Sequence, residues 1–148
     1  MKNVFLFAAL FLWSALDLTA QTQYAVVTSI ESIIPAGLGR SRIIANKEDL
    51  NTANFTTQRT DGIKSDMGTV KRQDIKIDNF EETKLLNFFS ISGINFQNVA
   101  SNDAMISAKL NEMAAAGWEL AFVATGVESD AGTPDGEGIF VTRYIFKR

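Results

Sequence analysis

Apolar and polar residues alternate near the start of the chain in a pattern that predicts a β-strand over residues 24–34. Val26 and Val27 would begin its two opposite faces, since successive side chains of a strand project to opposite sides. The many β-branched residues favour an extended backbone. A turn-rich segment, residues 35–39, ends this strand, and a short second strand is predicted at residues 42–44.

The middle of the chain has a weaker pattern. Residues 46–68 are polar and rich in Asn, Thr and Asp, so we expect a long polar insert that forms a loop with one helical turn around residues 48–51. Loops of this length are uncommon inside compact domains. Beyond it, alternation predicts a half-exposed strand at residues 69–78 and a more apolar strand at residues 84–91.

Helical periodicity predicts one main helix over residues 102–116. Its apolar residues recur at helical spacing and would form one buried face: Ile106, Leu110, Met113 and Ala114. Ser101 or Asn102 is a suitable N-cap, and Gly117 is well placed to end the last turn.

Two further strands are predicted at residues 118–127 and 138–147, joined by a turn-rich hairpin loop. The first has apolar residues on both faces, which is typical of a central strand covered on both sides. The second carries an aromatic stripe made of Phe140, Tyr144 and Phe146. Such a stripe usually packs on a helix, but on the face away from the helix it would suit a dimer interface.

These elements predict the fold class α+β: a mostly antiparallel sheet of about four to five strands with one main helix packed on one face. We expect residues 21–148 to form a single domain that contains the polar insert.

The N-terminal residues predict a secretory signal peptide at residues 1–20. Lys2 precedes an almost wholly apolar run at residues 4–16, and Ala20 offers a small residue at the cleavage site. The run is shorter than the ~20 apolar residues that a spanning helix needs. We therefore expect a periplasmic or secreted protein with no stable membrane span after cleavage.

Composition narrows the chemistry. The 148 residues include no His and no Cys. This excludes disulfides, His-based triads, Cys nucleophiles and the usual zinc ligand sets. We expect no cofactor. The formal net charge of −3 is unfavourable for nucleic-acid binding.

A family resemblance covers the C-terminal third. Residues 109–123, including Gly117-Trp118-Glu119-Leu120, and the final Tyr144-Ile-Phe-Lys-Arg148 resemble the domain of unknown function 4177 family. The resemblance implies a helix, then a hydrophobic strand and a C-terminal strand that ends in basic residues. It implies no activity. Residues 31–42 are similar to a group of exported Gram-negative envelope proteins.

One loop could bind an anion. Residues 37–42 are glycine-rich, and Gly39, Arg40, Ser41 and Arg42 could hold a phosphate, sulfate or carboxylate through amides, a hydroxyl and two guanidinium groups. The loop matches neither the dinucleotide fingerprint nor a P-loop. A tight turn with two surface Arg residues explains it equally well.

A second loop could bind calcium through oxygen ligands. Its four carboxylates are Glu128, Asp130, Asp135 and Glu137. Their spacing matches no known calcium motif, so a solvated acidic hairpin loop is the alternative.

Three classes of function follow. The first is a small, exported, non-catalytic envelope domain that associates with itself or with an envelope protein. The second is a domain that binds a small anionic ligand through the loop at residues 37–42. The third is a hydrolase that uses carboxylates alone, for which the dense candidates are Asp74, Asp78, Glu81 and Glu82. The absence of the common catalytic residue types favours the first.

Overall fold

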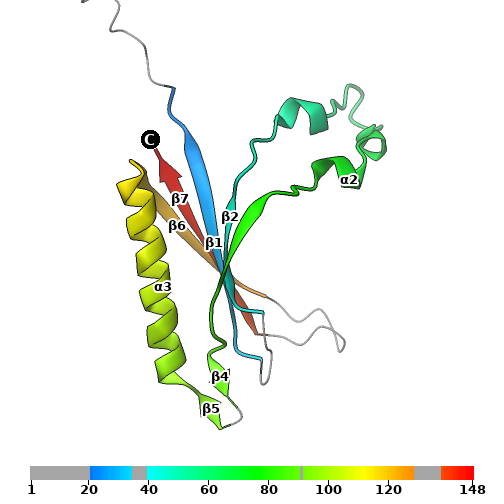
Figure 1. Cartoon of the computed structure of the whole chain (residues 1–148). Coiled ribbons are helices and arrows are strands. Elements are labelled where there is room, and N and C mark those ends of the chain that lie inside the picture. The colour runs from blue at the N-terminus through cyan, green and yellow to red at the C-terminus, as the bar shows by residue number, and fades with distance from the viewer. Residues whose placement is uncertain (1–20, 35–39, 91, 129–137) are drawn as a thin grey trace, which may run out of the picture.

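The computed structural model describes residues 21–34, 40–90, 92–128 and 138–148; the predicted signal peptide lies outside them. The protein forms a five-stranded antiparallel sheet with one long helix on one face (Figure 1). In spatial order the strands are β3 (Phe80–Lys84), β2 (Arg42–Asn46), β1 (Tyr24–Ser32), β7 (Ile139–Lys147) and β6 (Glu119–Val127). The helix is α3 (Phe96–Ala115). The predicted fold class is confirmed.

The central strand is β1, which pairs with β2 on one side and β7 on the other. Val27 of β1 stands opposite Ala45 of β2 and Tyr144 of β7. Because directly opposed residues project to the same face, this register assigns each side chain to one face of the sheet. Odd-numbered residues of β1 face α3, and even-numbered ones face away.

The hydrophobic core lies between α3 and this inner face of the sheet. Its buried residues are Val27, Ile43, Ala45, Leu85 and Phe146. Ile106, Leu110 and Met113 of α3 pack against them, as the helical periodicity predicts, whereas Ala114, predicted on the same face, is exposed. Burying one such large apolar side chain contributes about 1.5–3 kcal/mol. The apolar side chains of α3 therefore hold the helix against strands that are distant in the sequence.

The predicted start of the helix is wrong. Asn95 is the N-cap, and its side-chain oxygen accepts hydrogen bonds from the amides of Gln97 and Asn98. Asn102 lies inside the helix and is buried. Its side chain accepts from the N–H of Leu86 at 2.8 Å and donates to the carbonyl of the same residue at 2.8 Å. Asparagine is a common N-cap, but the side chain of Asn102 instead joins α3 to the backbone of Leu86.

The end of the helix follows the prediction. Gly117 has a φ of +83°, a left-handed conformation that favours glycine. Its N–H donates to the carbonyl of Ala114, and the N–H of Trp118 donates to the carbonyl of Met113. This pair of bonds is a Schellman motif, which ends the helix and sends the chain directly into β6.

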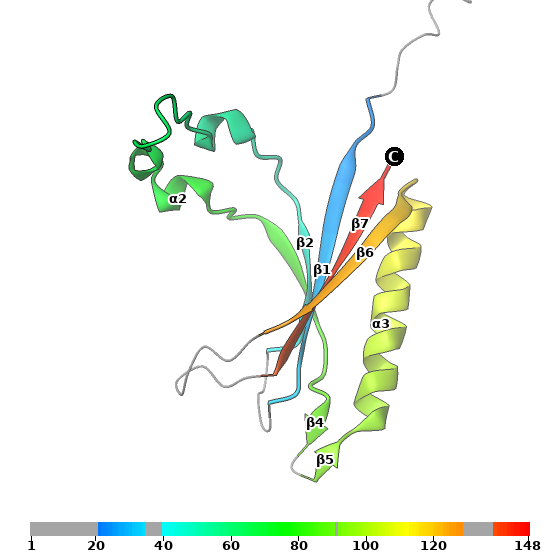
Figure 2. The same ribbon diagram turned by 180° about the vertical axis from the view of Figure 1, so that it is seen from behind.

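The insert between β2 and β3 is longer than the predicted polar insert and projects away from the rest of the domain (Figure 1). Residues 47–79 leave the sheet after β2, return at β3, and extend away from α3 in both views (Figures 1 and 2). They contain the 3₁₀ helices Thr52–Phe55 and Met67–Thr69 and the short helix α2 (Arg72–Ile75), none with a buried residue. The strand predicted at residues 69–78 is wrong, because no neighbouring strand pairs with this segment.

The strand predicted at residues 84–91 is also wrong as a single element. Lys84 ends β3, and the following residues cross beneath α3, where Asn102 holds Leu86. A minimal hairpin follows, made of β4 (Phe89–Ser90) and β5 (Gly93–Ile94).

The position of β6 differs from the prediction. The apolar residues on both of its faces predict a central strand, but β6 lies at the edge of the sheet and pairs only with β7. Every residue of β6 except Ala124 is exposed. The strand is apolar, but the buried core residues beneath α3 come from β1, β2, β7 and the segment after β3, and none comes from β6.

Among the described residues, no helix has the length and apolar character needed to cross a membrane.

Candidate functional site

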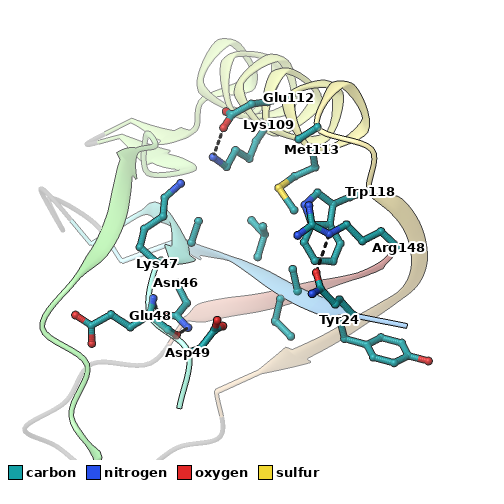
Figure 3. Close-up of a pocket in the computed structure, with 16 residues that line it drawn as sticks. Tyr24, Asn46, Lys47, Glu48, Asp49, Lys109, Glu112, Met113, Trp118 and Arg148 are labelled. Carbon is teal, nitrogen blue, oxygen red and sulfur yellow. Dashed lines mark hydrogen bonds and ion pairs between the residues drawn. The ribbon is translucent and has the colours of Figure 1, made fainter. Parts of the chain in front are cut away.

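A cleft opens between the C-terminal half of α3 and the ends of β1 and β2 (Figure 3). Its volume is about 830 Å³. Small side chains, including Ala25, Ala45 and Ala116, line it and leave the space open. A volume of this size would accommodate a small organic ligand.

Charged groups form one wall of the cleft. The ammonium group of Lys109 lies 2.8 Å from Glu112 Oε1 and 3.4 Å from Glu81 Oε2. Glu81 Oε1 is in turn 3.0 Å from Lys47 Nζ. Figure 3 shows Lys109 and Lys47 extending toward each other from α3 and from the sheet side. These contacts connect the helix to the β3 edge.

The pairs keep their groups ionised. Burial alone would lower the pKa of Lys109, but the hydrogen bonds and charges of Glu112 and then Glu81 outweigh it and raise the pKa. The hydrogen bond from Lys47 is the main cause that lowers the pKa of Glu81, and Lys109 adds to it. A lysine with a raised pKa is a poor general base or nucleophile, and a carboxyl group with a lowered pKa is a poor general acid.

The Glu81 network predicts a pH dependence of stability. Because its folded pKa lies below the unfolded value of 4.5, its contribution is fully present above pH 4.5 and is lost as the pH falls through the folded pKa. We expect the free energy of unfolding of the wild type to fall more steeply below pH 4.5 than that of Glu81→Gln. Urea unfolding across this range measures both, and parallel curves would contradict the prediction.

The other end of the cleft is closed by the C-terminal residue. The guanidinium of Arg148 stacks over Trp118, with Cζ 4.3 Å from the ring centroid. Its Nε donates to Gln23 Oε1 at 2.8 Å. Trp118 also packs against the core, as its position after the helix predicts. Arg148 is therefore engaged with the protein itself at this end.

A second candidate surface is the face of the sheet turned away from α3, which we call the outer face. The register brings apolar side chains from four strands together on it: Val26, Ile30, Ile44, Phe122, Val141 and Ile145. Val26 is 45% exposed and Phe122 is 62% exposed. Tyr24 and Phe80 extend the surface at its ends.

Ion pairs border the outer face on both sides. Arg42 and Glu82 are 2.6 Å apart beside the β3 edge, and Lys147 and Glu119 are 3.5 Å apart beside the β6 edge. Arg143 is exposed on the same face. Apolar side chains thus lie on either side of a polar pair at mid-strand, Thr28 and Arg143, and ion pairs border the face.

The aromatic stripe lies on the inner face. Phe146 is buried in the core, Tyr144 packs against that core, and Phe140 contacts Phe88 with ring centroids 6.3 Å apart. The stripe thus packs under the helix and is not the surface available to a partner.

Of the predicted anion loop, the structure describes Arg40, Ser41 and Arg42. Gly39 lies outside the described residues. Ser41 is buried, accepts a hydrogen bond from the amide of Ser32, and donates to Asn87 Oδ1 at 2.9 Å. Arg42 forms its ion pair on the outer face, and Arg40 is exposed. The serine hydroxyl is thus committed to holding the ends of β1 and β2 together.

For the predicted calcium loop, Asp130, Asp135 and Glu137 lie outside the described residues. Glu128 follows β6, and its amide donates to the carbonyl of Ile139 at 2.9 Å. Within the part of the chain that the structure describes, no group of three or more carboxylates is placed to hold a metal ion.

The dense carboxylates of the hydrolase hypothesis are also separated. Glu81 and Glu82 are consecutive on β3, so they project to opposite faces of the sheet. Asp74 lies in α2 on the projecting insert.

Neither surface is evident from the sequence. Recognising the outer face requires the pairing register of the strands, and recognising the cleft requires the position of α3 relative to β1 and β2. No family model, curated protein or solved structure matches the chain.

Proposed function

We propose that this protein is an exported, non-catalytic module that associates with another protein through the outer face of its sheet. The observation that carries the proposal is the apolar surface on the side of the sheet that α3 leaves uncovered. Export is supported by the charged start and apolar run of residues 1–20.

The size of the outer face suits a specific complex. Strands about 4.8 Å apart and a rise of about 3.3 Å per residue give it an area on the order of 600 Å². Specific complexes bury about 800 Å² on each partner, so the outer face and its rim together approach that area. Single apolar surface residues are ordinary, whereas apolar patches of a few hundred Å² on a protein surface are often functional.

The shape and charge of the outer face indicate the kind of partner. A flat surface of β-branched and aromatic side chains is complementary to another flat apolar protein surface, such as the face of a second sheet. Its rim holds both signs of charge in pairs, as in Arg42–Glu82 and Glu119–Lys147. Such a balanced rim lacks the basic field that a nucleic acid needs.

The charged cleft also supports a non-catalytic role. Contacts with Glu112 and then Glu81 raise the pKa of Lys109, and contacts with Lys47 and then Lys109 lower the pKa of Glu81, so both groups stay ionised. Their effect is to hold α3 against the sheet, which keeps the outer face in position.

Site-specific photocrosslinking in cells that export the protein tests this function. Val26 on the outer face is replaced by a photoreactive phenylalanine derivative, and Ala104, exposed on α3, receives the same residue as a matched control. We expect a discrete crosslinked product from position 26 and none from position 104. Adding Ile145→Lys to the first variant is expected to remove the product. The absence of a product at position 26, or the same products from both positions, would contradict the proposal.

A further inference from the structure

Within the described residues, the β6 edge carries little of the protection that normally prevents strand pairing: its only charged residue is Glu119 and its only irregularity is the bulge at Ala121. It is a nine-residue strand with hydrogen-bonding groups paired only on the β7 side. Residues 120–127 contain no charged residue and no proline. Proteins usually protect an exposed edge with charges, proline or a short strand, because free backbone groups recruit other strands.

The opposite edge of the same sheet shows the usual protection. β3 has only five residues, and three of them are charged: Glu81, Glu82 and Lys84. Two of these side chains form ion pairs within the protein. The two edges of one sheet therefore differ in the property that controls pairing, and only β6 is suited to accept a further strand.

Side chains on both faces of β6 support the same conclusion. Phe122 is exposed on the outer face, and Leu120, Val123 and Val127 are exposed on the inner side. A further strand beside β6 would contribute cross-strand neighbours on both faces at once. Packing on one face of the sheet alone would leave the other set exposed.

We propose that β6 pairs with β6 of a second copy of this chain in an antiparallel arrangement, so that two domains share one continuous sheet. The edge is a different surface from the centre of the outer face, and this inference stands on its own observations.

A second copy fits this edge because β6 can pair with an identical strand without bringing like charges together. With no charge between residues 120 and 127, an antiparallel copy can lie alongside without opposing like charges. The bulge at Ala121 lies near the start of the strand, so the regular segment that remains, residues 122–127, is available for pairing. A two-fold axis perpendicular to the sheet relates the two copies, and such isologous pairing closes at a dimer.

The pairing has a consequence for the shape of the assembly. The two-fold axis places both copies of α3 on one side of the shared sheet and both outer faces on the other. The two outer faces then form one surface of twice the width.

Two lysine substitutions separate the β6 edge from the outer face. The full chain is expressed in an exporting host and purified from the exported fraction. Val123→Lys adds a charge to the inner side of β6 and leaves the outer face unchanged, whereas Val26→Lys changes the outer face and leaves β6 unchanged. Light scattering after size exclusion, from low micromolar to near millimolar concentration, gives the mass, and thermal unfolding confirms that each variant is folded.

We expect the wild type and Val26→Lys to have twice the mass of one chain at high concentration, and Val123→Lys to stay at the mass of one chain. Backbone amides of residues 122–127 should exchange more slowly in the wild type at high concentration than at low concentration. A wild type that stays monomeric with unprotected β6 amides would overturn the inference. A dimer that Val26→Lys disrupts and Val123→Lys leaves intact would also overturn it, and would place self-association on the outer face instead. A monomeric wild type that still crosslinks from position 26 would overturn the inference alone and leave the proposed function intact.

Discussion

Replacing Phe146 by Ala is expected to lower the free energy of unfolding by about 3–5 kcal/mol. Phe146 is 1% exposed and lies on β7 between Ala25 of β1 and Leu120 of β6, beneath α3. Its neighbours Ala25 and Ala45 are small and cannot fill the cavity that the substitution would leave. Small domains are stable by about 5–15 kcal/mol in total, so much of the native stability would be lost.

Urea unfolding of dilute protein, monitored by the fluorescence of Trp118, measures this change. Phe122→Ala is the matched control, because it makes the same substitution at an exposed site on β6. We expect it to cost about 1 kcal/mol or less. Equal effects of the two substitutions would contradict the position of the core between α3 and the inner face.

Replacing Asn102 by Leu is expected to have a comparable effect, about 2–5 kcal/mol, although it introduces an apolar residue into a buried site. Asn102 is 1% exposed and satisfies both the N–H and the carbonyl of Leu86. Leucine is similar in volume but would leave both backbone groups without this partner at a partly buried site.

Asn111→Leu provides the control on the same helix, since Asn111 is exposed. Its expected effect is within about 0.5 kcal/mol. Amide exchange adds a local test: the N–H of Leu86 should lose protection in Asn102→Leu and keep it in Asn111→Leu. An unchanged protection of Leu86 would show that this amide has another partner.

The periodic parts of the chain could be predicted from the sequence. Alternation identified β1, β6 and β7 as strands, and helical spacing identified the buried stripe of α3. These predictions succeed because local backbone geometry decides which side chains share a face. The stop at Gly117 succeeds for the same reason, since a left-handed residue ends a helix whatever surrounds it.

The failures arise where tertiary contacts decide the outcome. Asn102 is a good N-cap in isolation, but its side chain is used by the backbone of Leu86, and the helix begins at an earlier asparagine. Residues 69–78 show weak alternation, but no neighbouring strand supplies hydrogen bonds to their backbone. The segment therefore does not form a strand.

The face of the sheet that α3 covers could not be predicted because both faces are apolar. On β7, the aromatic stripe that includes Phe146 alternates with Val141 and Ile145, and the alternation alone does not show which set meets α3. The aromatic side chains of β7 fill the space between the sheet and α3, where the small side chains of Ala25 and Ala45 leave room. The β-branched side chains of β7 lie on the outer face. The apolar composition of β6 predicts a buried strand for a similar reason, whereas the strand is an exposed edge.

Hydroxyl-radical footprinting of the exported protein in its native setting tests the outer-face assignment most directly. Tyr24 and Phe80 report on the outer face, and Met105 reports on the exposed side of α3. We predict that Tyr24 and Phe80 are modified less in that setting than in the purified monomer, while Met105 is modified equally in both. Equal modification of all three residues in the two settings would contradict the claim that a protein partner covers this face.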